Sequence, residues 1–147
     1  MTDYLNEISE FVADTRFNDI PDPAVERARR VIADTIAAIA AGSAEPEVIA
    51  LTARMGAQDG PSSIIGTRQR TKPSTAAFLN GTSGTFLELD EGNQFSRGHP
   101  GVHALPAALA IAESQEASGQ DFLTAIVLGY EIGARIGIAA KILPTMH

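Results

Sequence analysis

The residues best suited to acid–base chemistry lie together in one polar stretch, from position 88 to position 103. Two of the three histidines of the chain, His99 and His103, lie at its end. The stretch also contains the polar side chains of Glu88, Asp90, Glu91, Asn93 and Arg97. Imidazole titrates near neutral pH, so a histidine beside a carboxylate can take up or release a proton during a reaction. The composition of this stretch therefore suggests proton transfer.

Other interpretations of the same residues stay open at this point. An acidic loop between helices is commonly a solvated surface, and a histidine that begins a helix is commonly structural. Carboxylates and histidines also bind metal ions, but their spacing here matches neither an EF-hand loop nor a His-Glu-x-x-His helix, so we predict no metal site. The run Gly81-Thr82-Ser83-Gly84 lacks the ending of a phosphate-binding loop, and close helix packing accounts for it.

Composition limits the class of protein. The 147 residues are 44% hydrophobic and 20% charged, which is typical of a soluble globular domain. A net charge of −7 repels phosphate backbones and anionic lipids, so we expect no nucleic-acid partner and no membrane partner. The chain has no cysteine, which excludes disulfides and thiolate catalysis. Residues 1–11 do not resemble a signal peptide, so we expect a cytoplasmic protein.

The elements that must position the polar stretch are helices. Apolar spacing and the positions of proline and glycine predict helices over residues 5–12, 22–42, 46–55, 73–87, 102–116 and 121–143. We find no repeat and no convincing strand pair, although residues 63–66 could be a short extended piece. Pro106 would be tolerated only near the first turn of its helix. The prediction is an all-α, multi-helix domain.

The last predicted helix is long enough to span a bilayer, and residues 122–143 are apolar over most of their length. Glu131 and Arg135 argue against a membrane span, since each charge would cost about 2.5 to 3.5 kcal/mol near the middle of a bilayer. Their spacing predicts an ion pair on a buried core helix. The chain stops soon after this helix without a polar tail, so we expect residues 1–147 to be the N-terminal portion of a longer, truncated domain.

Several motifs occur in the order and spacing of one known family. They are Ala28-Arg29-Arg30-Val31-Ile32-Ala33-Asp34-Thr35, Ala76-Ala77-Phe78-Leu79-Asn80-Gly81-Thr82, Glu88-Leu89-Asp90-Glu91, Gly98-His99-Pro100-Gly101, Leu105-Pro106-Ala107-Ala108-Leu109-Ala110, Ser118-Gly119-Gln120-Asp121-Phe122 and Gly129-Tyr130-Glu131-Ile132-Gly133-Ala134-Arg135. Together they resemble the MmgE/PrpD family, and the resemblance covers nearly the whole chain.

The resemblance implies a large helical domain, with a smaller α/β lid domain that would be absent here. Members of the family include 2-methylcitrate dehydratase, cis-aconitate decarboxylase and an iminodisuccinate epimerase. Their shared chemistry is proton removal or delivery beside a carboxylate of a small polycarboxylate substrate. The resemblance implies no metal or organic cofactor, and it implies homodimers formed through the helical domain.

The resemblance also implies roles for individual residues. His99 is the first candidate for proton transfer, and Asp90 and His147 are the other candidate catalytic residues. The candidate substrate-binding residues are Glu88, Glu91, Asn93, Arg97 and His103. The family usually has Asp-Asp followed by Thr or His where this chain has Glu91-Gly92-Asn93, which leaves the substrate undecided.

Two hypotheses follow from different classes of protein. The first is a cofactor-independent lyase or isomerase, similar to 2-methylcitrate dehydratase, that acts on a di- or tricarboxylate by histidine-mediated proton transfer. We expect this chain alone to be inactive, because the lysines of the lid would be missing and few cations lie near its histidines. The alternative is a non-catalytic helical interaction module, or half of a split enzyme that is completed by a complementing C-terminal chain.

Overall fold

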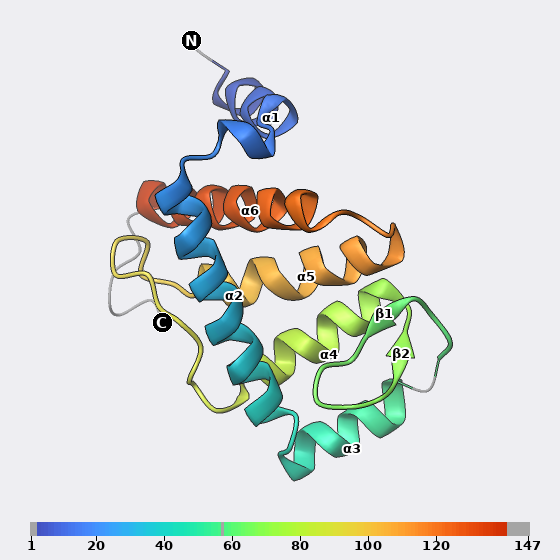
Figure 1. The fold of residues 1–147 in the computed structure, drawn as a ribbon. Coiled ribbons are helices and arrows are strands. Elements are labelled where there is room, and N and C mark those ends of the chain that lie inside the picture. Colours follow the sequence, from blue (N-terminus) through green and yellow to red (C-terminus); the bar gives the residue numbers. More distant parts are fainter. Residues whose placement is uncertain (1–2, 57, 141–147) are drawn as a thin grey trace.

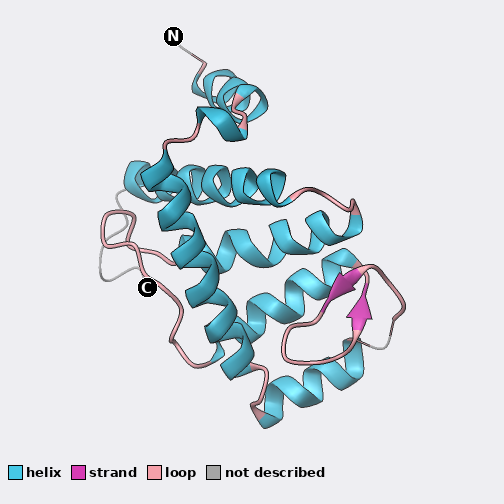
Figure 2. Cartoon of the chain, viewed as in Figure 1, coloured by secondary structure: helices cyan, strands magenta, loops and turns pink. Residues whose placement is uncertain are grey.

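The predicted helices form one helical domain in the structure, which is a computed structural model that describes residues 3–56 and 58–140 (Figures 1 and 2). All-α architecture is confirmed for these residues. The elements are α1 (Tyr4–Asp14), a 3₁₀ turn η1 (Phe17–Asp19), α2 (Asp22–Gly42), α3 (Pro46–Met55), β1 (Ser62–Ser63), β2 (Arg70–Thr71), α4 (Pro73–Phe86), α5 (Pro100–Ser114) and α6 (Gly119–Ala140).

Proline marks the start of four of these helices. It occupies the first or second position of α2, α3, α4 and α5, where its fixed φ suits a helix and its missing N–H has no intrahelical partner to lose. α5 begins at Pro100, two residues before the predicted start. The helix continues through Pro106, which lies in its second turn, close to the first turn near which it was expected to be tolerated.

The core lies where α2 crosses the layer formed by α4, α5 and α6 (Figure 1). α5 packs against α4 on one side and α6 on the other. Its Leu105 is fully buried in a cluster with Ala28 and Ile39 of α2 and Ile126 of α6. Burying a leucine or isoleucine side chain fully contributes about 1.5 to 3 kcal/mol, so this cluster fixes α2 against α5 and α6.

The prediction that the chain has no strand pair is wrong, because a short antiparallel ladder joins Ser62 to Thr71 and Ser63 to Arg70. Side chains from distant helices hold it. Asn80 of α4 accepts a hydrogen bond from the Ile65 amide and donates one to the Ser63 carbonyl. Two-residue strands carry no alternation of polar and apolar residues, so local sequence gives no signal for them.

Two predicted apolar helix faces are only partly covered. α1 is amphipathic as predicted, but none of its residues is buried, and Leu5 is 75% exposed. α1 lies beyond α6 at one end of the domain (Figure 1). On α6, Ile126, Leu128, Ala134 and Gly137 are buried. The prediction of a buried core helix is therefore met along one face of α6 and wrong along the other, where Ile136 is 59% exposed.

α6 is also long and apolar enough to cross a membrane by length and composition, and 22% of its most apolar 18-residue window is buried. Core helices of soluble proteins pass the same test. α2 and α3 would pass it only if they were counted together, although a 92° bend separates them. The predicted ion pair on α6 is confirmed, with Arg135 Nε donating to Glu131 Oε1 at 2.7 Å.

Candidate functional site

The polar stretch forms a loop between α4 and α5, and a turn around Asn93 organises it. The side-chain oxygen of Asn93 accepts hydrogen bonds from the Phe95 amide at 2.9 Å and the Ser96 amide at 3.0 Å. The backbone N–H of Asn93 donates a hydrogen bond to the Gly98 carbonyl oxygen at 2.8 Å. These bonds close the turn and fix the orientation of the Asn93 side chain, since an oxygen that accepts two N–H groups must be the carbonyl oxygen of the amide.

The turn packs closely against α6 at Gly137. A Cβ atom added to Gly137 would lie 2.7 Å from the Ser96 carbonyl oxygen, so only glycine allows this approach. Ser96 is buried against the helix. The close contact holds the loop beside α6, one face of which carries Tyr130.

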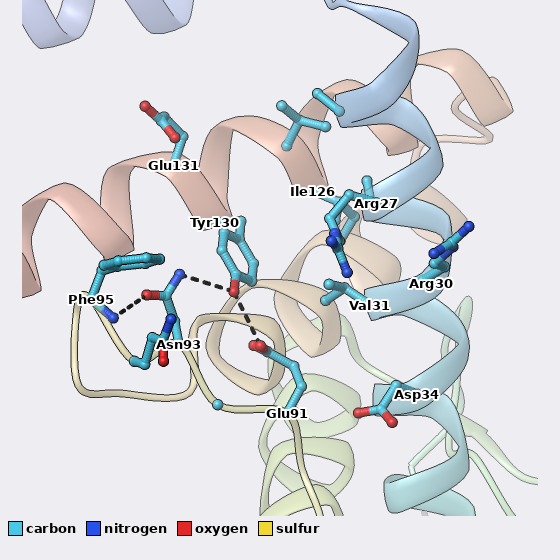
Figure 3. A pocket seen from close by; sticks show the side chains of 15 residues that line it. Arg27, Arg30, Val31, Asp34, Glu91, Asn93, Phe95, Ile126, Tyr130 and Glu131 are labelled. Atoms are coloured by element: carbon cyan, nitrogen blue, oxygen red, sulfur yellow. Dashed lines mark hydrogen bonds between the residues drawn. The ribbon is translucent and has the colours of Figure 1, made fainter.

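A directed chain of hydrogen bonds connects the loop to α6 and α5 (Figure 3). The Asn93 side-chain N–H donates to the Tyr130 hydroxyl oxygen at 3.2 Å, and that hydroxyl donates to Glu91 Oε2 at 3.1 Å. The other carboxylate oxygen of Glu91 accepts the Gly101 backbone N–H at 2.7 Å. Glu91 therefore satisfies a free N–H in the first turn of α5, where a negative charge also meets the positive end of the helix dipole.

Gly101 is required at this junction. A Cβ atom there would lie 2.8 Å from Glu91 Oε1, 2.9 Å from Thr35 Oγ1 and 2.9 Å from Val31 Cγ1. The start of α5 is thus pressed between the loop and α2. This contact explains why Glu91, ten residues earlier in the chain, reaches the helix start directly.

Tyr130 remains protonated in this network. Burial is the main cause that raises its pKa above the ordinary value, because the phenolate would lose hydration. The Asn93 hydrogen bond opposes that shift, the Glu91 carboxylate adds to it, and Arg27 of α2 opposes it weakly. At neutral pH the hydroxyl is therefore a hydrogen-bond donor to Glu91.

His99 lies beside this network, and one of its ring nitrogens, Nδ1, forms a hydrogen bond with the loop backbone. Its Nδ1 is 3.0 Å from the Glu91 carbonyl oxygen and 3.2 Å from Asp90 Oδ2. A carbonyl oxygen can only accept, so Nδ1 carries a hydrogen and Nε2 of the neutral ring keeps its lone pair. The Asp90 side chain is 3% exposed, and its Oδ2 accepts no hydrogen bond from any described residue. The His99 side chain is 44% exposed, so Nε2 remains accessible.

The structure brings four of the eight predicted site residues together, namely Asp90, Glu91, Asn93 and His99. Glu88 and Arg97 are exposed and have positive φ angles of 53° and 54°, so they form bends of the loop. His103 is exposed on the first turn of α5. His147 lies outside the described residues. Among the described residues, no group of three or more histidines and carboxylates is close enough to hold a metal ion.

A cavity of about 750 Å³ opens between α2, the loop and α6. Arg27 and Arg30 of α2 are among the residues that line it; the Arg27 side chain lies on the side of α2 that faces Tyr130, whereas the Arg30 guanidinium points away from Tyr130 and Asn93 (Figure 3). His99 is not among the residues that line it. The sequence prediction missed both arginines as site residues. The signal available was their shared helix face, since residues three positions apart on a helix are neighbours.

Two fungal proteins are similar in sequence to most of this chain. The chain is 35% identical over 142 residues to the cis-aconitate decarboxylase-like protein oryM of Aspergillus oryzae, covering 90% of this chain and 30% of that protein. It is 30% identical over 141 residues to the cis-aconitate decarboxylase of Aspergillus terreus, covering 91% of this chain and 29% of that protein. The chain thus spans about 30% of the length of these relatives.

The match to a family of proteins covers more of the chain than the match to either of these two relatives. The family model for the MmgE/PrpD N-terminal domain covers residues 6–145, which include every described helix except the first two residues of α1. Its coverage agrees with the order of motifs along the chain and with the helical fold. This chain belongs to the MmgE/PrpD family and matches its N-terminal domain.

Proposed function

We propose that the protein containing this chain is a cofactor-independent lyase that acts on a small polycarboxylate, with His99 as the residue that transfers a proton. The family and the lyase names of its relatives support the reaction class. The observation that carries the proposal is the hydrogen bond that His99 Nδ1 donates to the Glu91 carbonyl, beside the buried Asp90 carboxylate. It holds the ring and leaves Nε2 free for substrate.

The names of the relatives favour cis-aconitate as the first substrate to test. Decarboxylation breaks a C–C bond, releases CO₂ and leaves an electron pair that a neighbouring unsaturated carboxylate can delocalise. The carbon that receives this pair must then take a proton. A protonated His99 delivers that proton from Nε2 and returns to the neutral ring, whose Nδ1–H stays bonded to Glu91. Asp90 balances the positive charge before transfer.

The test uses the complete polypeptide encoded by the reading frame that contains this chain. It is incubated with cis-aconitate and with 2-methylcitrate, and CO₂ release and alkene formation are measured. In D₂O, a decarboxylation product should carry solvent deuterium at the carbon that His99 protonates. His99→Asn keeps an N–H donor near the position of Nδ1 but removes Nε2, and general acid–base catalysis is worth about 100- to 10,000-fold. We therefore expect kcat to fall at least 100-fold.

His103→Ala provides the comparison. His103 lies one turn into α5 and is exposed, so its loss should at most raise KM for substrate. Circular dichroism of both variants checks that the helices are retained. Full turnover by His99→Asn, with the fold intact, would refute the proposed role of His99 whichever substrate is turned over.

A second candidate function is half of a split enzyme, or a helical interaction module without catalysis. The exposed apolar faces of α1 and α6 favour it, since Leu5 and Ile136 would both gain from being covered by another chain. Light scattering of the chain mixed with a candidate C-terminal chain tests this candidate. A stable hetero-complex supports it, and a monodisperse monomer that shows no binding to the hydrophobic dye ANS argues against it.

A further inference from the structure

We infer that Glu91 is a positioning residue for His99: its carboxylate caps α5 in place of the His99 side chain, and so keeps that ring in the Nδ1–H form with Nε2 free. The inference rests on the proposed function, because it gives a second residue a part in proton transfer by His99. It also differs from the predicted role of Glu91, which was contact with substrate. The start of α5 carries the argument.

His99 occupies the N-cap position of α5, yet within this helix its side chain forms no capping hydrogen bond. A side chain at the N-cap commonly accepts a hydrogen bond from the backbone N–H two or three residues later. Two residues after His99, the N–H of Gly101 donates instead to Glu91 Oε1, at 2.7 Å. Glu91 therefore takes one of the bonds that the N-cap side chain would otherwise be placed to form.

Polar contacts, and not enclosure by other side chains, must set the orientation of the His99 ring. The side chain is 44% exposed, so the ring has room to turn. The oxygen atoms within 3.4 Å of Nδ1 are the backbone carbonyls of Asp90 and Glu91 and the Asp90 carboxylate. All three are acceptors, so they favour a hydrogen on Nδ1 as long as no donor competes for this nitrogen.

Loss of the Glu91 carboxylate would create such a donor. The Gly101 N–H would become an unsatisfied group in the first turn of α5, and Nδ1 of the N-cap histidine is the ring nitrogen nearer to the backbone. To accept this N–H, Nδ1 must lose its hydrogen, which in the neutral ring is then carried by Nε2. A ring bound in this way cannot hold protons on both nitrogens, although the proposed transfer begins from that form.

The Glu91 carboxylate is held in the capping position from both sides (Figure 3). Its Oε2 accepts from the Tyr130 hydroxyl at 3.1 Å, and that hydroxyl accepts from Asn93 at 3.2 Å. Its Oε1 occupies space that exists because Gly101 has no side chain, since a Cβ there would lie 2.8 Å away. The carboxylate is thus directed at the start of α5 by contacts from α6 and the loop.

The kinetic experiment uses the complete polypeptide and whichever of cis-aconitate and 2-methylcitrate it converts. Glu91→Met keeps the length of the side chain but removes both oxygen atoms. We expect it to lower kcat about 100-fold, as a misplacement of about 1 Å does, and to change KM by less than about threefold. Glu91→Gln keeps an oxygen for the Gly101 N–H, so its kcat should stay within about tenfold of wild type.

Glu47→Ala is the matched control, because it removes an exposed carboxylate from the first turn of a different helix, α3. Its kcat and KM should equal those of wild type. A role of Glu91 in substrate binding predicts the opposite division, in which KM rises and kcat is kept.

Nitrogen-15 NMR of the histidine-labelled polypeptide reads the tautomer without any turnover. The signals of His99 are those that His99→Asn removes. We expect the Nδ1–H form in wild type, Glu91→Gln and Glu47→Ala, and the Nε2–H form in Glu91→Met. Circular dichroism checks that the helices are retained, and Glu91→Ala, for which the same change is expected, replaces Glu91→Met if that variant does not fold.

The inference would be overturned if Glu91→Met kept the kcat of wild type, or if it kept the Nδ1–H form of His99. A raised KM with an unchanged tautomer would also overturn it, and would assign Glu91 to substrate binding. Full turnover by His99→Asn refutes only the proposed function, because the tautomer of His99 in Glu91→Met still shows whether Glu91 sets the state of the ring.

Discussion

Replacing Tyr130 by phenylalanine removes one oxygen atom and breaks two hydrogen bonds in the structure. The hydroxyl accepts from Asn93 at 3.2 Å and donates to Glu91 at 3.1 Å. The aromatic ring keeps its packing on α6, so the change isolates the polar network. If these hydrogen bonds hold the loop against α6 and α5, the Tyr130→Phe variant must have a lower free energy of unfolding than wild type.

The expected loss follows from the two bonds. A hydrogen bond to a charged group contributes about 1.5 to 3 kcal/mol when it is buried, and a neutral one about 0.5 to 1.5 kcal/mol. Tyr130 and Glu91 are both half-buried, so water replaces part of each interaction in the variant. We expect Tyr130→Phe to lower the free energy of unfolding by about 1 to 2 kcal/mol at pH 8, measured by urea denaturation.

The difference in the free energy of unfolding between wild type and Tyr130→Phe should become smaller at high pH. The pKa of Tyr130 is raised in the folded protein from its ordinary value of 10.0, first by burial and then by Glu91. A raised pKa means that the unfolded tyrosine ionises first, so the contribution of Tyr130 to stability is complete below pH 10 and declines as pH rises above it. The gap between wild type and Tyr130→Phe should therefore narrow between pH 8 and pH 11.

Tyr4→Phe serves as the matched control, because Tyr4 is the only other tyrosine in the chain and is largely exposed on α1. Its stability should equal that of wild type at every pH. The reasoning would be refuted if Tyr130→Phe were as stable as wild type at pH 8, or if the gap widened as the pH increased.

Substitutions at three further positions test how the loop and core are built. Gly137→Ala places a Cβ 2.7 Å from the Ser96 carbonyl, so the loop must move off α6, and thermal unfolding should show a loss of about 1 to 3 kcal/mol. Arg97 has a φ of 54°, so Arg97→Gly should change stability by less than about 0.5 kcal/mol and Arg97→Val should destabilise by about 1 to 2 kcal/mol, both measured by urea denaturation. Leu105→Ala empties the centre of the core and should cost about 2 to 5 kcal/mol in the same measurement.

The helices could be predicted because their signals are local. Pro23, Pro46 and Pro73 mark helix starts within one residue. The apolar spacing of α2 indicates its buried face only in part, because Val25, Ala28 and Ile39 are buried whereas Ile36 is 37% exposed. The start of α5 was predicted two residues late, although Pro100 gives the same local signal, and the first turn of this helix is also capped from outside the helix. Glu91 accepts the Gly101 N–H from ten residues earlier, and no local pattern records that contact.

The loop between α4 and α5 could be predicted in composition but not in the roles of its individual residues. The composition of the stretch grouped Asp90, Glu91 and His99, and the family resemblance gave Glu91 a role in binding substrate, whereas in the structure each of its carboxylate oxygens accepts a hydrogen bond from within the chain. A ligand would have to share this carboxylate with α5 and Tyr130. The role of Glu91 in substrate binding therefore stays a prediction, and its observed role is to hold the loop.

The cavity between α2, the loop and α6 shows why net charge is a weak guide to the groups that a ligand of this chain would meet. A total of −7 led to the expectation that nucleic acids and anionic lipids are not partners. The total counts every exposed carboxylate equally, although charges beyond about 8 to 10 Å are largely screened at physiological salt. A ligand in the cavity meets only the nearest groups, among which are Arg27, Asp34 and Glu91. That Arg27 of α2 and Glu91 of the loop line one cavity depends on the return of the loop to α2, over sixty residues later in the chain, and that return is set by tertiary contacts.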